Sequence, residues 1–218
     1  MAIKTPYSRN APVGPMYRLG LRGSTITAVT GCLYPGTMTS AIYQFQWTSP
    51  NSVAIVSAVE FYFTTATVFT TAQPLQFGLY NIRGYTVPCS GGTVATFATI
   101  QGYQTGALDS RFAQTYFVTG GAINIANSQA TGFTNGTGRV DQYPSRIWDG
   151  IGCATLGVSD GQMGAGGFFQ SGYAPNTQSL FFRQNEGFII APMITLGAGG
   201  GLQITCVVEW AEMGAQYY

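Results

Sequence analysis

The sequence predicts an all-β fold, an antiparallel β-sandwich of jelly-roll-like kind with an extended N-terminal arm and long glycine-rich loops. Residues 202–210 alternate between apolar and polar side chains, which is the period of a strand with one buried face. Runs rich in β-branched and aromatic residues recur at spacings of about ten to fifteen residues, as in sandwiches. The chain also has 30 glycines, which suit turns and loops better than helices.

The stretch 202–210 is expected to be a core strand. Gln203, Thr205 and Glu209 face away from the core in this interpretation. The opposite face carries the five side chains predicted to be buried: Leu202, Ile204, Cys206, Val208 and Trp210. The apolar run 188–191 is predicted to be its hairpin partner, because the glycine-rich residues 197–201 can supply the reversal between them.

Earlier strands follow the same period of two. Residues 43–47 place three aromatic side chains on one face and two glutamines on the other. Residues 53–65 form a longer strand, in which Val59, Phe61 and Phe63 oppose Glu60 and Tyr62. In residues 75–80, every second side chain is again apolar. These strands are expected to flank the C-terminal one, because an isolated hairpin is not stable in water.

The chain divides into an extended arm, residues 1–22, and one β-sandwich domain, residues 23–218. The arm contains three prolines and no acidic residue, and its cations Lys4, Arg9, Arg18 and Arg22 are predicted to contact a partner. A frayed terminus is the alternative interpretation of the same segment. Residues 132–179 are rich in glycine and are expected to form long surface loops, in which Asp149 precedes a glycine as a turn residue.

The composition indicates a surface that contacts other subunits. Charged residues make up 8% of the chain, compared with roughly 25% in ordinary soluble domains. Interface cores are depleted in charge and enriched in aromatic residues, so we expect a homo-oligomer of three to five copies. A monomeric β protein with a neutral surface is the alternative. A net charge of +1 argues against strong electrostatic binding to nucleic acid or to an anionic membrane.

The sequence lacks the residues that the common kinds of catalytic, metal and phosphate-binding sites use. The chain has no histidine, and its only lysine lies in the arm, which disfavours the usual triads, Schiff-base chemistry and phosphate-binding loops. The acidic residues show neither a calcium-loop spacing nor a clear catalytic pair. The four cysteines are far apart and are expected to be free thiols. We therefore predict no enzymatic activity, no cofactor and no metal site.

Aromatic side chains allow a second interpretation, as a platform on which sugars stack. The aromatics considered for it are Tyr43, Trp47, Tyr62, Trp148 and Tyr173. Aromatics at alternating strand positions are more often core residues or cross-strand pairs. The core interpretation is therefore preferred, and the sugar platform is kept as the rival.

Some segments resemble the small structural proteins of tailed bacteriophages. The likeness lies in Phe-Thr-Thr-Ala-Gln (69–73), Gly-Leu-Tyr-Asn-Ile-Arg (78–83), Ser-Gly-Gly-Thr (90–93), and the ending Asn-Glu-Gly-Phe-Ile-Ile (185–190) followed by Val-Glu-Trp (208–210). It extends over residues 41–130 and 180–212. The resemblance implies a virion component, a β-sandwich or jelly roll that decorates or cements a capsid, and it implies no catalytic residues.

The sequence thus leads to an expected function and two rivals. The expected function is a non-enzymatic structural protein of the virion, assembled in the host cytoplasm, with the major capsid protein or other virion proteins as partners. The first rival is a carbohydrate- or receptor-binding appendage of a phage. The second is a coat protein whose N-terminal arm contacts nucleic acid, for which four positive charges would neutralise few phosphates. The first residues lack the apolar core of a signal peptide, and no membrane association is expected.

Overall fold

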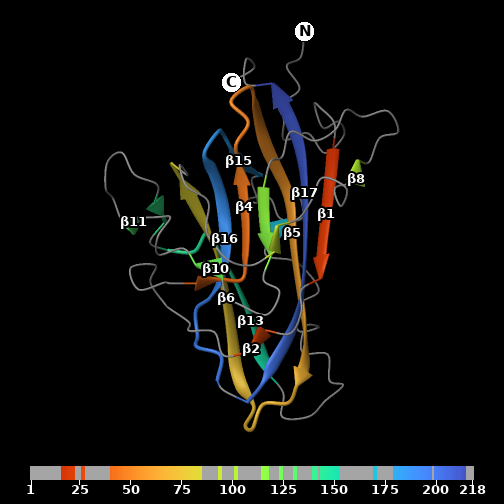
Figure 1. Cartoon of the computed structure of the whole chain (residues 1–218), viewed down its shortest axis with the longest axis vertical. Helices are drawn as coiled ribbons and strands as arrows, with labels where there is room; N and C mark the ends of the chain where they lie inside the picture. Colours follow the sequence, from red (N-terminus) through yellow and green to blue (C-terminus); the bar gives the residue numbers. More distant parts are fainter. Residues whose placement is uncertain are drawn as a thin grey trace.

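The structure is a computed structural model of the whole chain. It describes residues 16–22, 26–27, 40–84, 93–94, 101–102, 114–117, 123–124, 130–131, 139–141, 143–152, 169–170, 179–197 and 199–214. Every regular element in these residues is a β-strand, which confirms the predicted all-β fold. The long strands run along the long axis of the molecule (Figure 1).

The strands form two large sheets and one small one. The first sheet, sheet A, has the order β14-β5-β17-β1-β8, with β15 beside β5 and β2 beside β17. Its strands are β1 (Met16–Arg22), β2 (Ile26–Thr27), β5 (Ser52–Thr67), β8 (Gln101–Gly102), β14 (Phe169–Gln170), β15 (Leu180–Phe182) and β17 (Gly201–Gly214).

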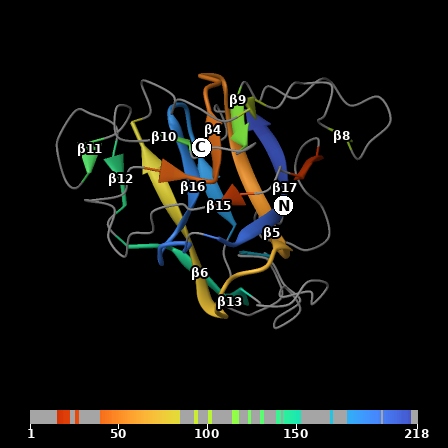
Figure 2. The ribbon, with the colours of Figure 1, turned by 60° about the horizontal axis from the view of Figure 1, so that its bottom comes forward.

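The second sheet, sheet C, has the order β11-β12-β6-β16-β4-β9-β7, with β13 also beside β6. Its strands are β4 (Tyr43–Trp47), β6 (Gln73–Arg83), β7 (Thr93–Val94), β9 (Gln114–Phe117), β11 (Ala130–Thr131), β12 (Arg139–Val140), β13 (Arg146–Gly152) and β16 (Glu186–Pro192). The small sheet pairs β3 (Ser40–Ala41) with β10 (Ile123–Asn124). Figure 2 shows β4, β6 and β16 on one side and β5 and β17 on the other.

Aromatic side chains from the two sheets meet in the core between them. Phe61 of β5 lies 5.1 Å from Phe77 of β6, measured between ring centroids, and Phe45 of β4 lies 5.7 Å from Trp210 of β17. These contacts identify the two layers as a sandwich, since each sheet buries one face against the other. The side chains predicted for the core strand all lie here: Leu202, Ile204, Cys206, Val208 and Trp210 are each at most 1% exposed.

The longest pair of strands, β5 and β17, contains a β-bulge. Glu209 is opposite Ala58 and Trp210 is opposite Val56, so Ser57 has no partner residue in β17. The hydroxyl of Ser57 donates instead to the backbone oxygen of Glu209 at 3.3 Å. The extra residue reverses the alternation along β5. Val56 faces the core before the bulge, and Val59 faces it after the bulge.

The predicted hairpin of residues 188–191 with 202–210 is wrong. β16 pairs with β4 and β6 of sheet C, whereas β17 pairs with β5, β1 and β2 of sheet A. Phe188, Ile189, Ile190 and Ala191 are all 0% exposed, so both faces of β16 are buried. A strand buried on both faces occupies the middle of a sheet, and the residues after Pro192 cross to the opposite sheet instead of making a tight turn.

The expected arm of residues 1–22 is corrected for residues 16–22. These residues form β1, which pairs with β17 in seven registered positions from Met16↔Ala211 to Arg22↔Thr205. Tyr17 is 2% exposed and Leu19 is 0% exposed, so β1 contributes to the core. Residues 1–15 lie outside the described residues.

The loop-rich insert of residues 132–179 contains strands as well. β12 and β13 both pair with β6, and β14 pairs with β5. Asp149, expected in a turn, lies in the middle of β13 opposite Gln76. Trp148 faces the core, 4.4 Å from Phe63 between ring centroids, and its burial accounts for a strand at this position.

Candidate functional site

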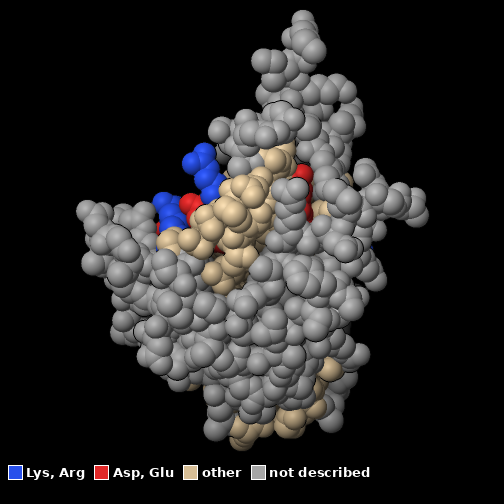
Figure 3. All heavy atoms as spheres, turned by 45° about the horizontal axis from the view of Figure 1, so that its top comes forward, with Lys and Arg blue, Asp and Glu red and all other residues tan. Residues whose placement is uncertain are grey.

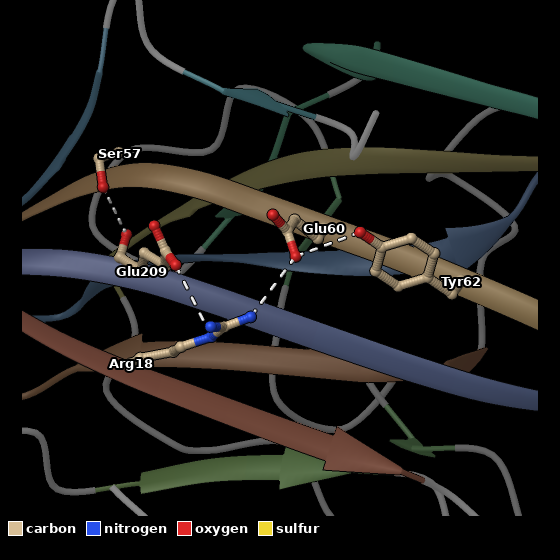
Figure 4. Close-up of polar contacts among 5 residues, drawn as sticks. All are labelled: Arg18, Ser57, Glu60, Tyr62 and Glu209. Carbon is tan, nitrogen blue, oxygen red and sulfur yellow. Dashed lines mark hydrogen bonds and ion pairs between the residues drawn. The ribbon is translucent and has the colours of Figure 1, made fainter. Parts of the chain in front are cut away.

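The outward face of sheet A carries a cluster of polar side chains from three strands (Figure 4). Arg18 comes from β1, Glu209 from β17, and Glu60 and Tyr62 from β5. Arg18 Nη2 lies 3.8 Å from Glu60 Oε2, and Arg18 Nε lies 3.7 Å from Glu209 Oε1. The Tyr62 hydroxyl donates to Glu60 Oε2 at 3.3 Å. We call these four residues the Arg18 cluster.

The strand register brings the Arg18 cluster together. Arg18 is opposite Glu209 on the neighbouring strand, and Gly20 is opposite Val207, which is in turn opposite Glu60. Residues opposite one another in antiparallel strands point to the same face. The inward neighbours on the same strands are core residues, so the period of two leaves the four polar side chains facing outward.

The electrostatics of the cluster are those of a partly exposed network. The side chain of Arg18 is 42% exposed, and those of Glu60 and Glu209 are 22% and 23% exposed. Burial raises the pKa of Tyr62; the charge of Glu60 and the hydrogen bond to it raise this pKa further, and Arg18 opposes the rise. Surface ion pairs of this kind contribute about 0–1 kcal/mol to the free energy of folding. The cluster therefore adds little to the stability of the fold.

Next to the cluster, the layer of side chains has a gap at Gly20. Gly20 is exposed, and among the described residues the one atom within 4 Å of an ideal Cβ built there, apart from its chain neighbours, is Val207 Cγ2 at 3.7 Å. The side chain of Val207, opposite Gly20 on β17, lies beside this gap and is 7% exposed.

A second surface of interest lies on the outward side of β13, at sheet C. Ile147 is 51% exposed and Ile151 is 52% exposed, and nearby in the chain Tyr143 is 64% exposed. Between the two isoleucines, Asp149 Oδ1 accepts a hydrogen bond of 2.7 Å from Gln76 Nε2 of β6. We call Tyr143, Ile147 and Ile151 the β13 apolar surface.

One end of the sandwich carries further charges. Arg83, at the end of β6, has Nη2 3.2 Å from Asp141 Oδ2, and the backbone N–H of Arg183 donates to Glu186 Oε2 at 2.8 Å. Figure 3 shows basic and acidic side chains close together at this end, beside uncharged surface. Positive and negative side chains thus lie next to each other at this end, and the described residues there do not share one sign of charge.

The structure describes some of the predicted contact residues of the arm and not others. Arg18 lies in β1 and forms ion pairs with two carboxylates of its own chain, and its contact with a partner stays a prediction. The backbone of Arg22 ends β1, and its side chain lies outside the described part of the structure. Lys4 and Arg9 also lie outside the described residues.

The rival interpretation, a sugar platform, is not supported for most of the aromatics considered for it. Trp47 is 0% exposed, Tyr43 is 1% exposed and Trp148 is 7% exposed, so all three belong to the core. Tyr62 is exposed and belongs to the Arg18 cluster, and Tyr173 lies outside the described residues. The three buried rings pack in the sandwich as the preferred interpretation predicts.

Among the described residues, no group of three or more His, Cys, Asp and Glu side chains is placed to hold a metal ion. Cys206 is a free, buried thiol, and desolvation raises its pKa far above the ordinary value, which keeps it protonated and unreactive at neutral pH. The other three cysteines lie outside the described residues. The described segments also include no helix with the length and apolar character that crossing a bilayer requires.

Sequence reasoning missed both surfaces. The alternation of Tyr17 and Leu19 with Arg18 and Gly20 was a strand signal that the neighbouring prolines and cations obscured. The spacing of Ile147, Asp149 and Ile151 was another strand signal, which Gly150 and Gly152 made look like a loop. No sequence signal brings Glu60 and Glu209 to the same arginine, because their shared contact with Arg18 depends on the registers of β1, β17 and β5.

Comparisons with known proteins add no relative: no family model, no curated protein and no solved structure matches the chain.

Proposed function

We propose that this protein is a non-enzymatic structural component of a phage particle, which decorates or cements the capsid through contacts with copies of itself and with other virion proteins. The observation that carries the proposal is the β13 apolar surface. Two isoleucines of β13, and Tyr143 before this strand, are each at least half exposed and lie close together in the sequence. Exposed apolar groups on a sheet commonly mark an interaction site.

The composition supports the same role. Only 8% of the residues are charged, so few charged side chains oppose the association of such a surface with other proteins. The described arginines Arg18 and Arg83 are paired with carboxylates, so they favour a nucleic-acid contact less than free cations would. The resemblance of residues 41–130 and 180–212 to small phage structural proteins is the reason for proposing a capsid as the partner.

The test replaces the isoleucines of the β13 apolar surface and measures assembly. The double variant Ile147→Thr/Ile151→Thr keeps β-branched residues in the strand, so it should fold with a melting temperature close to that of the parent. We expect the parent to form a small oligomer in light scattering at micromolar concentration and the variant to shift toward monomer. In gradient-purified particles, quantified by mass spectrometry, the variant should be depleted.

The matched control is Ala66→Ser/Thr67→Ser, at two exposed positions of β5 in the opposite sheet. It should assemble and enter particles as the parent does. A parent protein that is monomeric and absent from particles would refute the proposed function. If the folded isoleucine variant assembles at the parent level, the β13 apolar surface is not the surface through which the protein assembles.

A further inference from the structure

Strand β13 lies at an edge of sheet C over the part of the chain that the structure describes. It pairs with β6 along its whole length, from Arg146↔Leu79 to Gly152↔Gln73, and no described strand pairs with it on its other side. Every second residue of an edge strand directs its N–H and C=O groups away from its one neighbour. A further strand can therefore be added beside β13, next to the β13 apolar surface.

The features that commonly keep an edge strand from pairing are weak in β13. Residues 146–152 include neither proline nor lysine. The acidic side chain, Asp149, is drawn toward β6, because its Oδ1 accepts the hydrogen bond of 2.7 Å from Gln76 Nε2 on that strand. Gly150 and Gly152 bring no side chain that could cover the edge. Within the described residues, this edge is thus suited to a partner strand.

The size of the β13 apolar surface also favours a strand as its partner. A stable protein interface needs about 800 Å² from each partner. Two isoleucines and a tyrosine, each between 51% and 64% exposed, supply only part of that area. Backbone hydrogen bonds along the edge can supply further binding free energy, and a strand is the element that forms a row of them.

The sequence of β13 is complementary to itself when two copies run antiparallel. Asp149 is the central residue of the seven, so a two-fold axis at this position pairs every residue of the strand with one of the second copy. Residues opposite one another in such a pair share a face. Ile147 of each copy then meets Ile151 of the other on the outward side, and the two apolar contacts are equivalent.

On the other face of the strand, each large side chain would be opposite a glycine. Trp148 would be opposite Gly150 of the second copy, and Arg146 opposite Gly152. The indole of Trp148 already occupies the space beside Gly150 of its own chain, where an ideal Cβ would meet the ring. Because glycine brings no side chain, the pairing adds nothing against the buried Trp148 rings.

Charge permits the same pairing with one unfavourable contact. β13 carries one arginine and one aspartate, so its formal charge is zero. The two Asp149 side chains would meet at the axis, which disfavours the pairing, although each is bonded to Gln76 of its own chain. We propose that β13 pairs with β13 of a second copy, antiparallel and centred on Asp149, so that sheet C continues from one copy into the next. This pairing rests on the proposed function, since it names the partner of the β13 apolar surface.

The first measurement is the association of the intact protein in sedimentation velocity. An isologous contact closes after two copies, so a dimer is expected, with a dissociation constant of about micromolar to tens of micromolar. Hydrogen exchange is then compared below and above this concentration. Peptides that cover residues 146–152 should exchange more slowly in the dimer, because edge amides gain partners. Peptides from residues 201–208, inside sheet A, should exchange equally at both concentrations.

The decisive comparison uses two charged variants of the same two positions. In Ile147→Glu/Ile151→Glu the pairing would place carboxylates opposite one another, and the dimer should be lost. In Ile147→Lys/Ile151→Glu each lysine would face a glutamate of the second copy, and the affinity should stay within about ten-fold of the parent's. Both positions are exposed, so both variants should melt close to the parent.

A third variant tests the position of the axis. Asp149→Asn keeps an oxygen that can accept from Gln76 and removes the like charges at the axis. It should therefore strengthen the dimer by about two- to five-fold. An Asp149→Asn protein that associates no more tightly than the parent would show that the two strands do not pair around this residue.

The pairing and the proposed function can fail separately. Equal loss of association in both charged variants, isoleucine-dependent assembly of three or more copies, or unchanged exchange at residues 146–152 would each refute the pairing. The proposed function would still stand in these cases, with the β13 apolar surface binding through its side chains alone. A dimer that behaves as expected but is absent from purified particles would refute the proposed function and support the pairing.

Discussion

The indole of Trp148 lies across the bare backbone of Gly150, two residues further along the same face of β13. An ideal Cβ on Gly150 would stand 2.6 Å from Trp148 Cη2 and 2.8 Å from Phe63 Cζ. Trp148 also contacts Phe61 and Phe77, with ring centroids 5.7 and 5.9 Å away. The glycine that resembles a turn signal in the sequence is therefore needed for packing between the sheets.

Gly150→Ala is expected to destabilise the fold by about 1–3 kcal/mol, because the methyl group must displace two buried aromatic rings. Chemical denaturation measures the loss. The matched control is Gly20→Ala, where the space is open, and its stability should equal or slightly exceed that of the parent. Equal stabilities for Gly150→Ala and the parent would show that Trp148 does not depend on this glycine.

Trp210→Ala is expected to cost roughly 3–5 kcal/mol of folding free energy. Trp210 is 0% exposed, stacks on Tyr17 at 5.8 Å, and its Nε1 donates to Glu212 Oε1 at 3.3 Å. Trp210→Phe keeps part of the buried ring and should lose less. Thermal melting of both variants tests this order, which would be contradicted if Trp210→Ala melted within a few degrees of the parent.

Removal of β1 is expected to destabilise the sandwich, since Leu19 is fully buried and Tyr17 stacks on Trp210. Leu19→Ala should cost about 2–5 kcal/mol. Arg18→Ala, whose side chain is partly exposed, should cost no more than about 1 kcal/mol. A chain that starts at residue 23 should therefore melt well below one that starts at residue 16. Similar melting temperatures for the two truncated chains would mean that β1 is dispensable.

The raised pKa of Tyr62 predicts a dependence of stability on alkaline pH. The folded protein favours the protonated phenol, so the contribution of Tyr62 is fully present below its ordinary pKa of 10.0 and is lost as the pH rises through the raised value. Unfolding curves of the parent and of Tyr62→Phe should therefore converge or cross only above pH 10.0. Glu60→Gln should lower the pKa of Tyr62, and an unchanged phenol titration would contradict the role of Glu60.

The strands with one buried face could be predicted from the sequence. In β5 beyond its bulge, and over residues 74–77 of β6 and 202–206 of β17, burial follows the period of two that the side chains show. The faces agree as well, since Phe61, Phe63 and Leu202 are core residues and Tyr62 is exposed. Local patterning is enough in these strands, because each side chain meets either the opposite sheet or the outward face.

Pairing partners and the two surfaces could not be predicted in this way. The run Phe188 to Ala191 is apolar throughout, and such a run fits a hairpin edge or the middle of a sheet equally well until its neighbours β4 and β6 are known. The Arg18 cluster joins residues about 40 and 150 positions apart in the sequence, through registers that only the folded sheet defines.

The bulge at Ser57 sets which side chains of β5 face the core before and after it. In a regular antiparallel pair, sliding one strand by two residues keeps every side chain on its own face, so such misaligned pairs compete with the native one. In β5 the faces exchange at Ser57, and a slide that moves the bulge turns core side chains toward water and outward ones into the core. The unpaired serine thus disfavours pairings in which the bulge lies elsewhere in β5, because such pairings expose apolar side chains that favour aggregation.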